Sequence, residues 1–200
     1  MSEQNDSFQA QIVENAKRDA KEQLNNWVAV AIALIATFTG ITKIKDDNIV
    51  QAMLQAKSDA VDRWNESQAA KIKLHIEESG LQHAEMELDG SSAAHQQKLN
   101  ALILNYRTAI EKYKNRAEEA QASAKENEKN YADLGYRDDQ FDMSDMFLSI
   151  AMSLLAVASL TGKRWLFHFA LVLSVFGIIM GVAGFAQIQV HPEFLVKFLT

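Results

Sequence analysis

Three stretches of this 200-residue chain contain no Asp, Glu, Lys or Arg. They cover residues 27–42, 146–162 and 165–186, so all 26 acidic and all 20 basic side chains that carry formal charge lie elsewhere. The whole-chain averages of 48% hydrophobic and 23% charged residues hide this segregation. Long uncharged apolar stretches are typical of transmembrane helices, because a bilayer core of about 30 Å is crossed by roughly 20 helical residues.

Each stretch fits one membrane crossing. The third is long enough by itself, and the first reaches the required length because the chain is uncharged from Gln23 onwards. The second lies at the short limit, so a re-entrant segment is the alternative there. Trp27 and Trp165 flank their stretches, where interfacial anchors are expected. Lys43 and Lys45 follow the first stretch in place of a small-residue cleavage site, which favours an uncleaved anchor over a signal peptide.

The composition favours long helices. The chain has one proline, Pro192, and proline breaks helices by removing a backbone donor. It has no cysteine, which excludes disulfides and thiolate metal sites. The net charge of -6 argues against a nucleic-acid partner, which requires a basic face.

The sequence therefore predicts an all-α integral membrane protein with three transmembrane helices. The expected segments are a polar, amphipathic N-terminal segment 1–26, transmembrane helices 27–42, 146–162 and 165–186, a soluble helical-hairpin domain 43–145 and a C-terminal tail 187–200. Short segments on the N-terminal side carry more basic residues than the tail, and basic residues favour the cytoplasm. We expect a cytoplasmic N-terminus and a periplasmic insert in a bacterial inner membrane.

The insert has the pattern of two helices joined by a turn. Asp46 or Asp47 can cap the first helix, Gly80 is a possible interruption, and Gly135 is expected to end the second. Apolar residues of the first helix recur at intervals of three or four residues, or multiples of these intervals: Ile49, Met53, Ala56, Ala60, Trp64, Ile72 and Ile76. The turn is placed at Gly90-Ser91-Ser92. The second helix, from Ala93, has a narrow stripe of Leu99, Leu102, Tyr106, Ala109 and Tyr113 that thins into alanines. A stripe of this period is typical of a coiled coil, here in an antiparallel hairpin.

Self-association is expected, because two helices with an alanine-rich seam bury little apolar surface by themselves. The residues predicted to form the assembly surface are Trp64, Gln68, Ile72, Leu99, Leu102, Tyr106 and Tyr113. Small residues also recur along each span, with Gly177 and Gly181 in a GxxxG pattern of the third. Such stripes let helices approach closely in lipid, either within one bundle or between copies.

No catalytic or cofactor-binding constellation stands out. His75, His83 and His95 lie near Glu85 and Glu87, but no zincin motif is formed. The acidic collar before the second span comprises Asp138, Asp139, Asp142 and Asp145, and its spacing matches no EF-hand. We expect no metal, no cofactor and no enzymatic activity, and we expect the collar to be solvated.

Two stretches carry a family resemblance. The segment Asp62-Arg63-Trp64-Asn65-Glu66-Ser67-Gln68-Ala69-Ala70-Lys71-Ile72-Lys73 and the segment Leu160-Thr161-Gly162-Lys163-Arg164-Trp165 are similar to a bacterial membrane-protein family known as domain of unknown function 4337. Family members often have tyrosines at the positions of Glu66 and Ser67. The resemblance implies the same three-span architecture with a helical insert, and it implies no activity, cofactor or catalytic residue.

The sequence favours a non-enzymatic membrane scaffold. It would self-associate or serve as an accessory subunit of a larger membrane complex, with the lipid bilayer as its other partner. The alternative is a homo-oligomeric channel lined by hydroxyl side chains such as Thr37 and Ser153.

Overall fold

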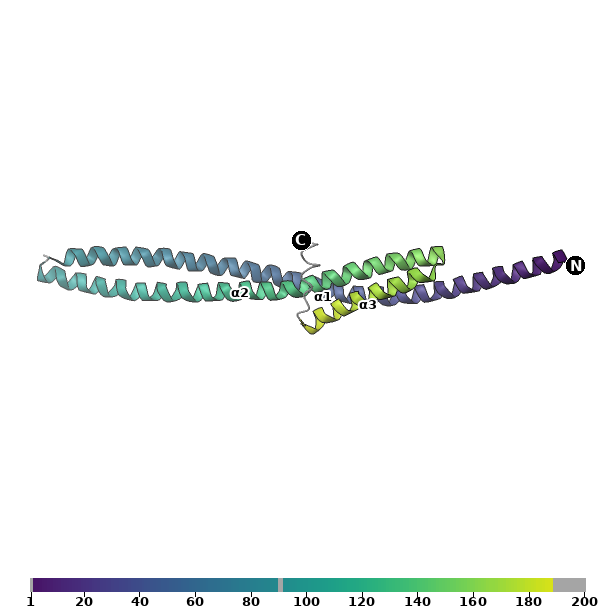
Figure 1. Ribbon diagram of the computed structural model, residues 1–200. Coiled ribbons are helices and arrows are strands. Elements are labelled where there is room, and N and C mark those ends of the chain that lie inside the picture. The colour runs from purple at the N-terminus through teal and green to yellow at the C-terminus, as the bar shows by residue number, and fades with distance from the viewer. Residues whose placement is uncertain (1, 90–91, 189–200) are drawn as a thin grey trace. The chain divides into compact units, whose positions relative to one another are not determined.

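Long α-helices form the part of the chain that the computed structural model describes, residues 2–89 and 92–188. They are α1 (Ser2–Leu88), α2 (Ala93–Thr161) and α3 (Arg164–Ala186) (Figure 1). No strand occurs among the described residues, which confirms the predicted all-α class. Each helix contains a stretch long and apolar enough to cross a membrane.

The helices are longer than the predicted segments. α1 passes through Asp46 and Gly80 without a break, and α2 passes through Gly135, so the predicted helix start, interruption and end at these positions are wrong. A glycine inside a helix costs only about 1 kcal/mol, which packing on either side offsets. The predicted start of the second helix at Ala93 is confirmed. Most of the predicted turn (residues 90–91) and of the tail (residues 189–200, with Pro192) lies outside the described residues.

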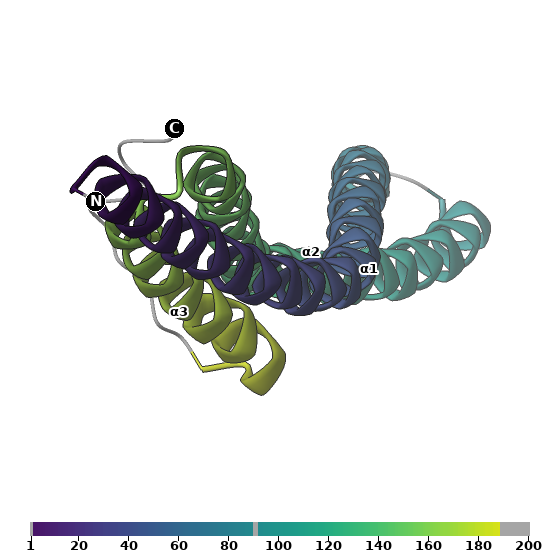
Figure 2. The ribbon, with the colours of Figure 1, turned by 90° about the vertical axis from the view of Figure 1, so that its right-hand side faces the viewer.

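The contacts divide the chain into two units. Unit 1 combines residues 1–50 with 134–200, and unit 2 comprises residues 51–133. In unit 2, the two helical segments run antiparallel on either side of the turn. In unit 1, α3 packs with the first part of α1 and the last part of α2 (Figure 2).

A tight turn joins α2 to α3. Gly162 has a φ of 68°, a left-handed conformation that glycine adopts without steric cost, and its N–H donates to the carbonyl of Ala158 at 2.9 Å. Lys163 is extended and precedes the first turn of α3. The second and third predicted spans are thus neighbouring helices of one unit.

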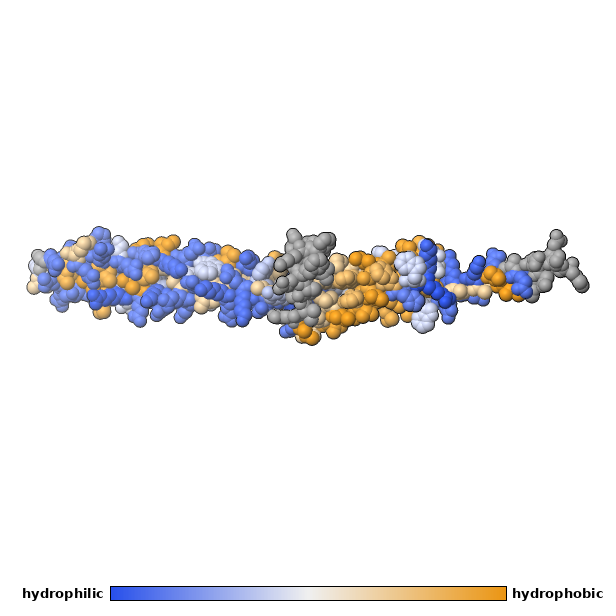
Figure 3. All heavy atoms as spheres, in the orientation of Figure 1, coloured by the Kyte–Doolittle hydropathy of each residue, from blue (hydrophilic) through white to orange (hydrophobic). Residues whose placement is uncertain are grey.

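The core of unit 1 follows from the apolar periodicity of its helices. One cluster of its buried residues comprises Leu24, Val28, Ile35, Leu148, Leu155 and Ala170. Many large apolar side chains of these segments are nevertheless exposed in this chain, whereas unit 2 is mostly hydrophilic outside (Figure 3).

Candidate assembly surfaces

The seam of unit 2 follows a 3-4 alternation on α2. Its buried and half-buried members are Leu99, Ile103, Tyr106, Ile110, Tyr113, Ala117, Ala120 and Ala124. The predicted stripe contained Leu102, which is 41% exposed, so that assignment to the seam is wrong. The first step of the alternation after Leu99 is four residues, so the next seam position is Ile103, and a step of three residues then leads to Tyr106.

Near the turn, the seam is apolar and closely packed. Ala84, Leu99 and Ile103 form one buried cluster, and Tyr106 packs against it. Gly80 provides the space for the tyrosine ring, because a Cβ at this position would lie 2.7 Å from Tyr106 Cε1. Gly80 therefore leaves space for the Tyr106 ring without interrupting α1.

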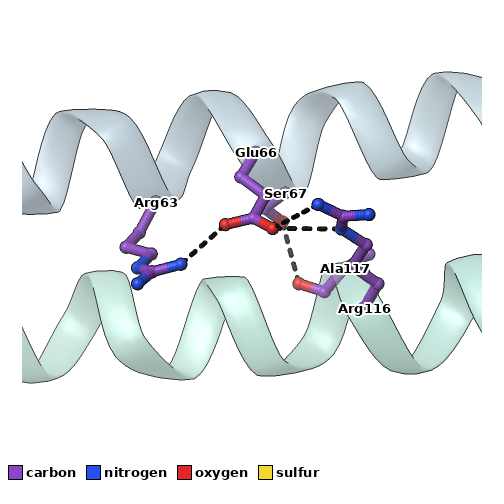
Figure 4. Close-up of polar contacts among 5 residues, drawn as sticks. All are labelled: Arg63, Glu66, Ser67, Arg116 and Ala117. Carbon is purple, nitrogen blue, oxygen red and sulfur yellow. Dashed lines mark hydrogen bonds and ion pairs between the residues drawn. The ribbon is translucent and has the colours of Figure 1, made fainter.

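In the alanine-rich part of the seam, the backbones of the two helices approach closely enough for a serine to bridge them. Ser67 is fully buried, and its hydroxyl donates to the carbonyl of Ala117 at 2.9 Å (Figure 4). Beside it, Glu66 accepts from Arg63 Nη1 at 2.8 Å and from Arg116 Nε at 3.0 Å. The hydrogen bonds from Arg116 and then Arg63 lower the pKa of the Glu66 carboxyl. One carboxylate thus links both helices.

Aromatic side chains add further contacts between the helices of unit 2. Trp64 is half-buried and its Nε1 donates to Glu128 on α2 at 2.9 Å. The Nζ of Lys73 lies 5.7 Å from the ring centroid of Tyr113, within the range of a cation–π contact. Trp64 and Tyr113 therefore contribute to the contact between the two helices of the hairpin.

A second apolar surface of unit 2 faces away from the seam. Ile72 and Ile76 are each 62% exposed, so their assignment to the face that packs on the partner helix is wrong. Their spacing from Trp64 leaves the register of the buried positions, which runs through Ser67, Ala70 and Leu74. The outer apolar residues of α1 are Leu54, Val61, Ile72 and Ile76, with the exposed Gln68 among them.

In unit 1, the glycines of α3 face the same chain. A Cβ on Gly177 would lie 2.7 Å from Leu148 Cγ, and one on Gly181 would lie 2.8 Å from Phe38 Cε1. Gly184 makes similar room for Phe141. This stripe packs inside the three-helix bundle, which is one of the two roles that the sequence left open.

The small residues of α1 have a different orientation. Ala29, Ala33, Ala36 and Gly40 are all exposed, and a Cβ on Gly40 would meet nothing within 4 Å. On a helix with 3.6 residues per turn, their common direction points well away from the buried face of the same segment. The described part of unit 1 leaves this stripe uncovered.

The acidic collar is only partly solvated. Asp46, expected as a helix cap, is 5% exposed; its Oδ2 accepts from Lys43 Nζ at 3.1 Å, and its buried Oδ1 has no donor among the described residues. Burial, with the charges of Asp142 and Asp46, raises the pKa of Asp138 to about 6. A proton on Asp138 would supply the donor that Asp46 lacks. Burial also raises the pKa of Asp142, and the hydrogen bond to Asp46 raises that of Lys43.

Two of the three histidines of the insert form ordinary surface pairs. His75 Nδ1 lies 3.0 Å from Glu78 Oε2, and His95 Nε2 lies 3.3 Å from Glu87 Oε1. Within residues 2–89 and 92–188, no group of three or more His, Cys, Asp or Glu side chains could hold a metal ion.

The family follows from a comparison of the whole sequence with family models. The model described as "Domain of unknown function (DUF4337)" matches residues 24–187. The chain belongs to this family. The DUF4337 match covers α1 from residue 24 onwards and all of α2 and α3, and therefore includes unit 2 and most of unit 1. No curated protein and no solved structure matches the chain closely enough to count as a relative.

Two features of the site were not predicted from the sequence. The Ser67–Ala117 contact and the ion pair of Glu66 with Arg116 join residues 50 positions apart. Extending the register of the alanines through Ser67 indicates that position as buried, but its hydrogen-bond partner depends on the register between the helices.

Proposed function

We propose that this protein is a non-enzymatic integral membrane scaffold that self-associates. In this proposal the unit 1 parts of α1, α2 and α3 cross the bilayer and unit 2 forms a helical hairpin outside it. Large exposed apolar side chains of all three span segments support membrane insertion: Leu34, Leu160 and Val175 are 69%, 78% and 55% exposed. A soluble protein rarely exposes apolar surface on this scale.

The observation that carries self-association is the uncovered stripe of α1. Ala29, Ala33, Ala36 and Gly40 offer a surface without bulky side chains, on which a second helix can pack closely. Because lipid provides no hydrophobic drive for association, close packing on small residues is the main source of affinity between spans. A second copy of α1 offers the same surface, so the contact is self-complementary.

Unit 2 supports the same role outside the membrane. Leu54, Val61, Ile72 and Ile76 expose apolar surface on the face of α1 that the hairpin leaves free. We propose that this surface, together with Gln68, contacts another copy or a subunit of a larger membrane complex.

We further propose a bacterial inner-membrane location, with the N-terminus in the cytoplasm and unit 2 in the periplasm. Lys17, Arg18, Lys21, Lys163 and Arg164 occupy the short segments on the proposed cytoplasmic side. Basic residues in short segments favour that side.

Paired substitutions on α1 test self-association. Ala33→Leu adds bulk on the stripe, and Val30→Leu adds bulk at another exposed position of the same helix. Leucine and alanine are both good helix formers, so the monomer remains intact. We expect the mass of the wild-type and Val30→Leu proteins in phosphatidylcholine nanodiscs to be that of an oligomer, and Ala33→Leu to shift it to the monomer. Monomeric wild-type protein, or an unchanged oligomer in Ala33→Leu, would overturn the proposal.

The same preparations test the channel alternative. Thr37 Oγ1 donates to the carbonyl of Ala33 at 2.8 Å and Ser153 Oγ to that of Ser149 at 2.9 Å, so both hydroxyls bond within their own helix. If the protein is a scaffold, we expect it to produce no conductance in planar bilayers. Conductance that Thr37→Leu or Ser153→Leu abolishes would identify a channel.

A further inference from the structure

A groove lies between α1 and α3 of unit 1, beside the turn that joins α2 to α3. Its volume is about 400 Å³. Its apolar lining consists of Leu24, Trp27, Phe167 and Leu171, and its polar lining consists of Gln23, Arg164 and His168. Among the described residues, none that lines the groove is acidic.

Basic side chains gather at the same end of unit 1. A Cβ on Gly162 would lie 4.0 Å from Lys21 Cδ, which places the Lys21 side chain next to the turn that carries Lys163 and Arg164. Arg18 is paired with Glu22 at 3.6 Å. In the part of the chain that the structure describes, no ion pair involves Lys21, Lys163 or Arg164, so their charge is available to an anion.

His168 adds a polar atom to the groove. Its Nδ1 lies 2.7 Å from the carbonyl oxygen of Arg164, which only accepts, so Nδ1 carries a proton and donates. The ring packs edge-to-face on Phe167, with centroids 5.7 Å apart. Nε2 is then the nitrogen left for a ligand.

The position of the groove at the edge of the membrane indicates which kind of molecule binds in it. Trp27 and Trp165 are 60% and 63% exposed, and exposed tryptophans at the ends of spans lie at the level of lipid headgroups. At that level, a basic rim above an apolar slot matches a molecule with a phosphate at one end and an acyl chain at the other. We infer that the groove binds a phospholipid with an anionic headgroup. Its phosphate lies between Arg164 and Lys21, and an acyl chain lies along Trp27, Phe167 and Leu171.

This inference depends on the proposed membrane insertion, and one experiment separates the two. In the full chain with Trp64→Phe and Trp165→Phe, Trp27 is the only tryptophan and reports directly on the groove. The protein is reconstituted into phosphatidylcholine vesicles that contain about one-fifth phosphatidylglycerol. Either lipid is brominated in turn, and quenching of Trp27 fluorescence is compared per mole of brominated lipid.

We expect brominated phosphatidylglycerol to quench more strongly by a factor above about five, because each basic side chain near an anionic headgroup contributes about fivefold and the groove has two, Arg164 and Lys21. Arg164→Gln and Lys21→Gln should each reduce this preference. Lys45→Gln, which removes the same charge beyond the other end of the first span, should leave it unchanged. Equal quenching by the two lipids, or a preference that Arg164→Gln leaves unchanged, would overturn the lipid site and leave membrane insertion standing. Failure of both lipids to quench would overturn insertion and the site together.

Discussion

Ser67 allows the close packing of the hairpin to be tested quantitatively. Replacement by leucine removes the hydrogen bond to the Ala117 carbonyl, which contributes about 1 kcal/mol. It also inserts a larger side chain where the serine is already fully buried, and overpacking costs about 1–3 kcal/mol. Together they lower the free energy of unfolding by about 2–4 kcal/mol. Ser67→Ala loses only the hydrogen bond and gains helix propensity, so its net cost is below about 1 kcal/mol.

The assay is thermal unfolding of the full chain in nanodiscs, followed by far-UV circular dichroism, with hydrogen exchange of unit 2 as a local readout. Ser79→Leu is the matched control, because Ser79 is exposed on the same helix and the substitution should change stability by less than about 0.5 kcal/mol. We expect Ser67→Leu to accelerate amide exchange across the seam. Equal effects of the two substitutions would show that the helices do not approach closely at Ser67.

Three further predictions concern packing and pH. Gly177→Ala should lower the melting temperature of unit 1, because its Cβ would lie 2.7 Å from Leu148 Cγ; an unchanged melting temperature would contradict this packing. Gly80→Ala should displace the Tyr106 ring, which is measurable as a change in tyrosine fluorescence. Unchanged fluorescence would show that the Tyr106 ring does not pack against Gly80. The raised pKa of Asp138, about 6, means that the folded state binds the extra proton, so stability should fall as pH rises from about 4 to 6. After allowance for solvent screening the expected loss is about 1 kcal/mol. It should be smaller in Asp138→Asn in pH-dependent melting, because the raised pKa of Asp142 still contributes, and an unchanged pH profile in that variant would refute the assignment.

The helical architecture could be predicted from the sequence because its signals are local. The apolar stretches and the near-absence of proline required only composition and spacing. The helix boundaries at Asp46, Gly80 and Gly135 were wrong because acids and glycines mark helix ends only when packing does not extend the helix through them. The seam of α2 was correct except at Leu102 and Ala109, where the seam instead runs through the adjacent Ile103 and Ile110, because apolar residues at adjacent positions made the register ambiguous.

Orientation of side chains could not be derived from the spans, because both faces of a membrane helix are apolar. The stripe of α3 with Gly177 and the stripe of α1 with Gly40 look alike in sequence, yet the first is buried in unit 1 and the second is exposed. The interaction of the buried Asp46 with Asp138 of α2 joins residues that are far apart in the sequence, which no local pattern indicates.

Disulfide cross-linking along the first span tests the central claim, self-association in the membrane, most directly. The chain has no cysteine, so each variant with one cysteine between residues 27 and 42 carries a single thiol. After oxidation in native membranes, we expect the yield of covalent dimers to be highest for Ala29→Cys, Ala33→Cys, Ala36→Cys and Gly40→Cys, and lower for Val30→Cys and Leu34→Cys. Monomers at every position, or dimers that form equally on all faces, would contradict it.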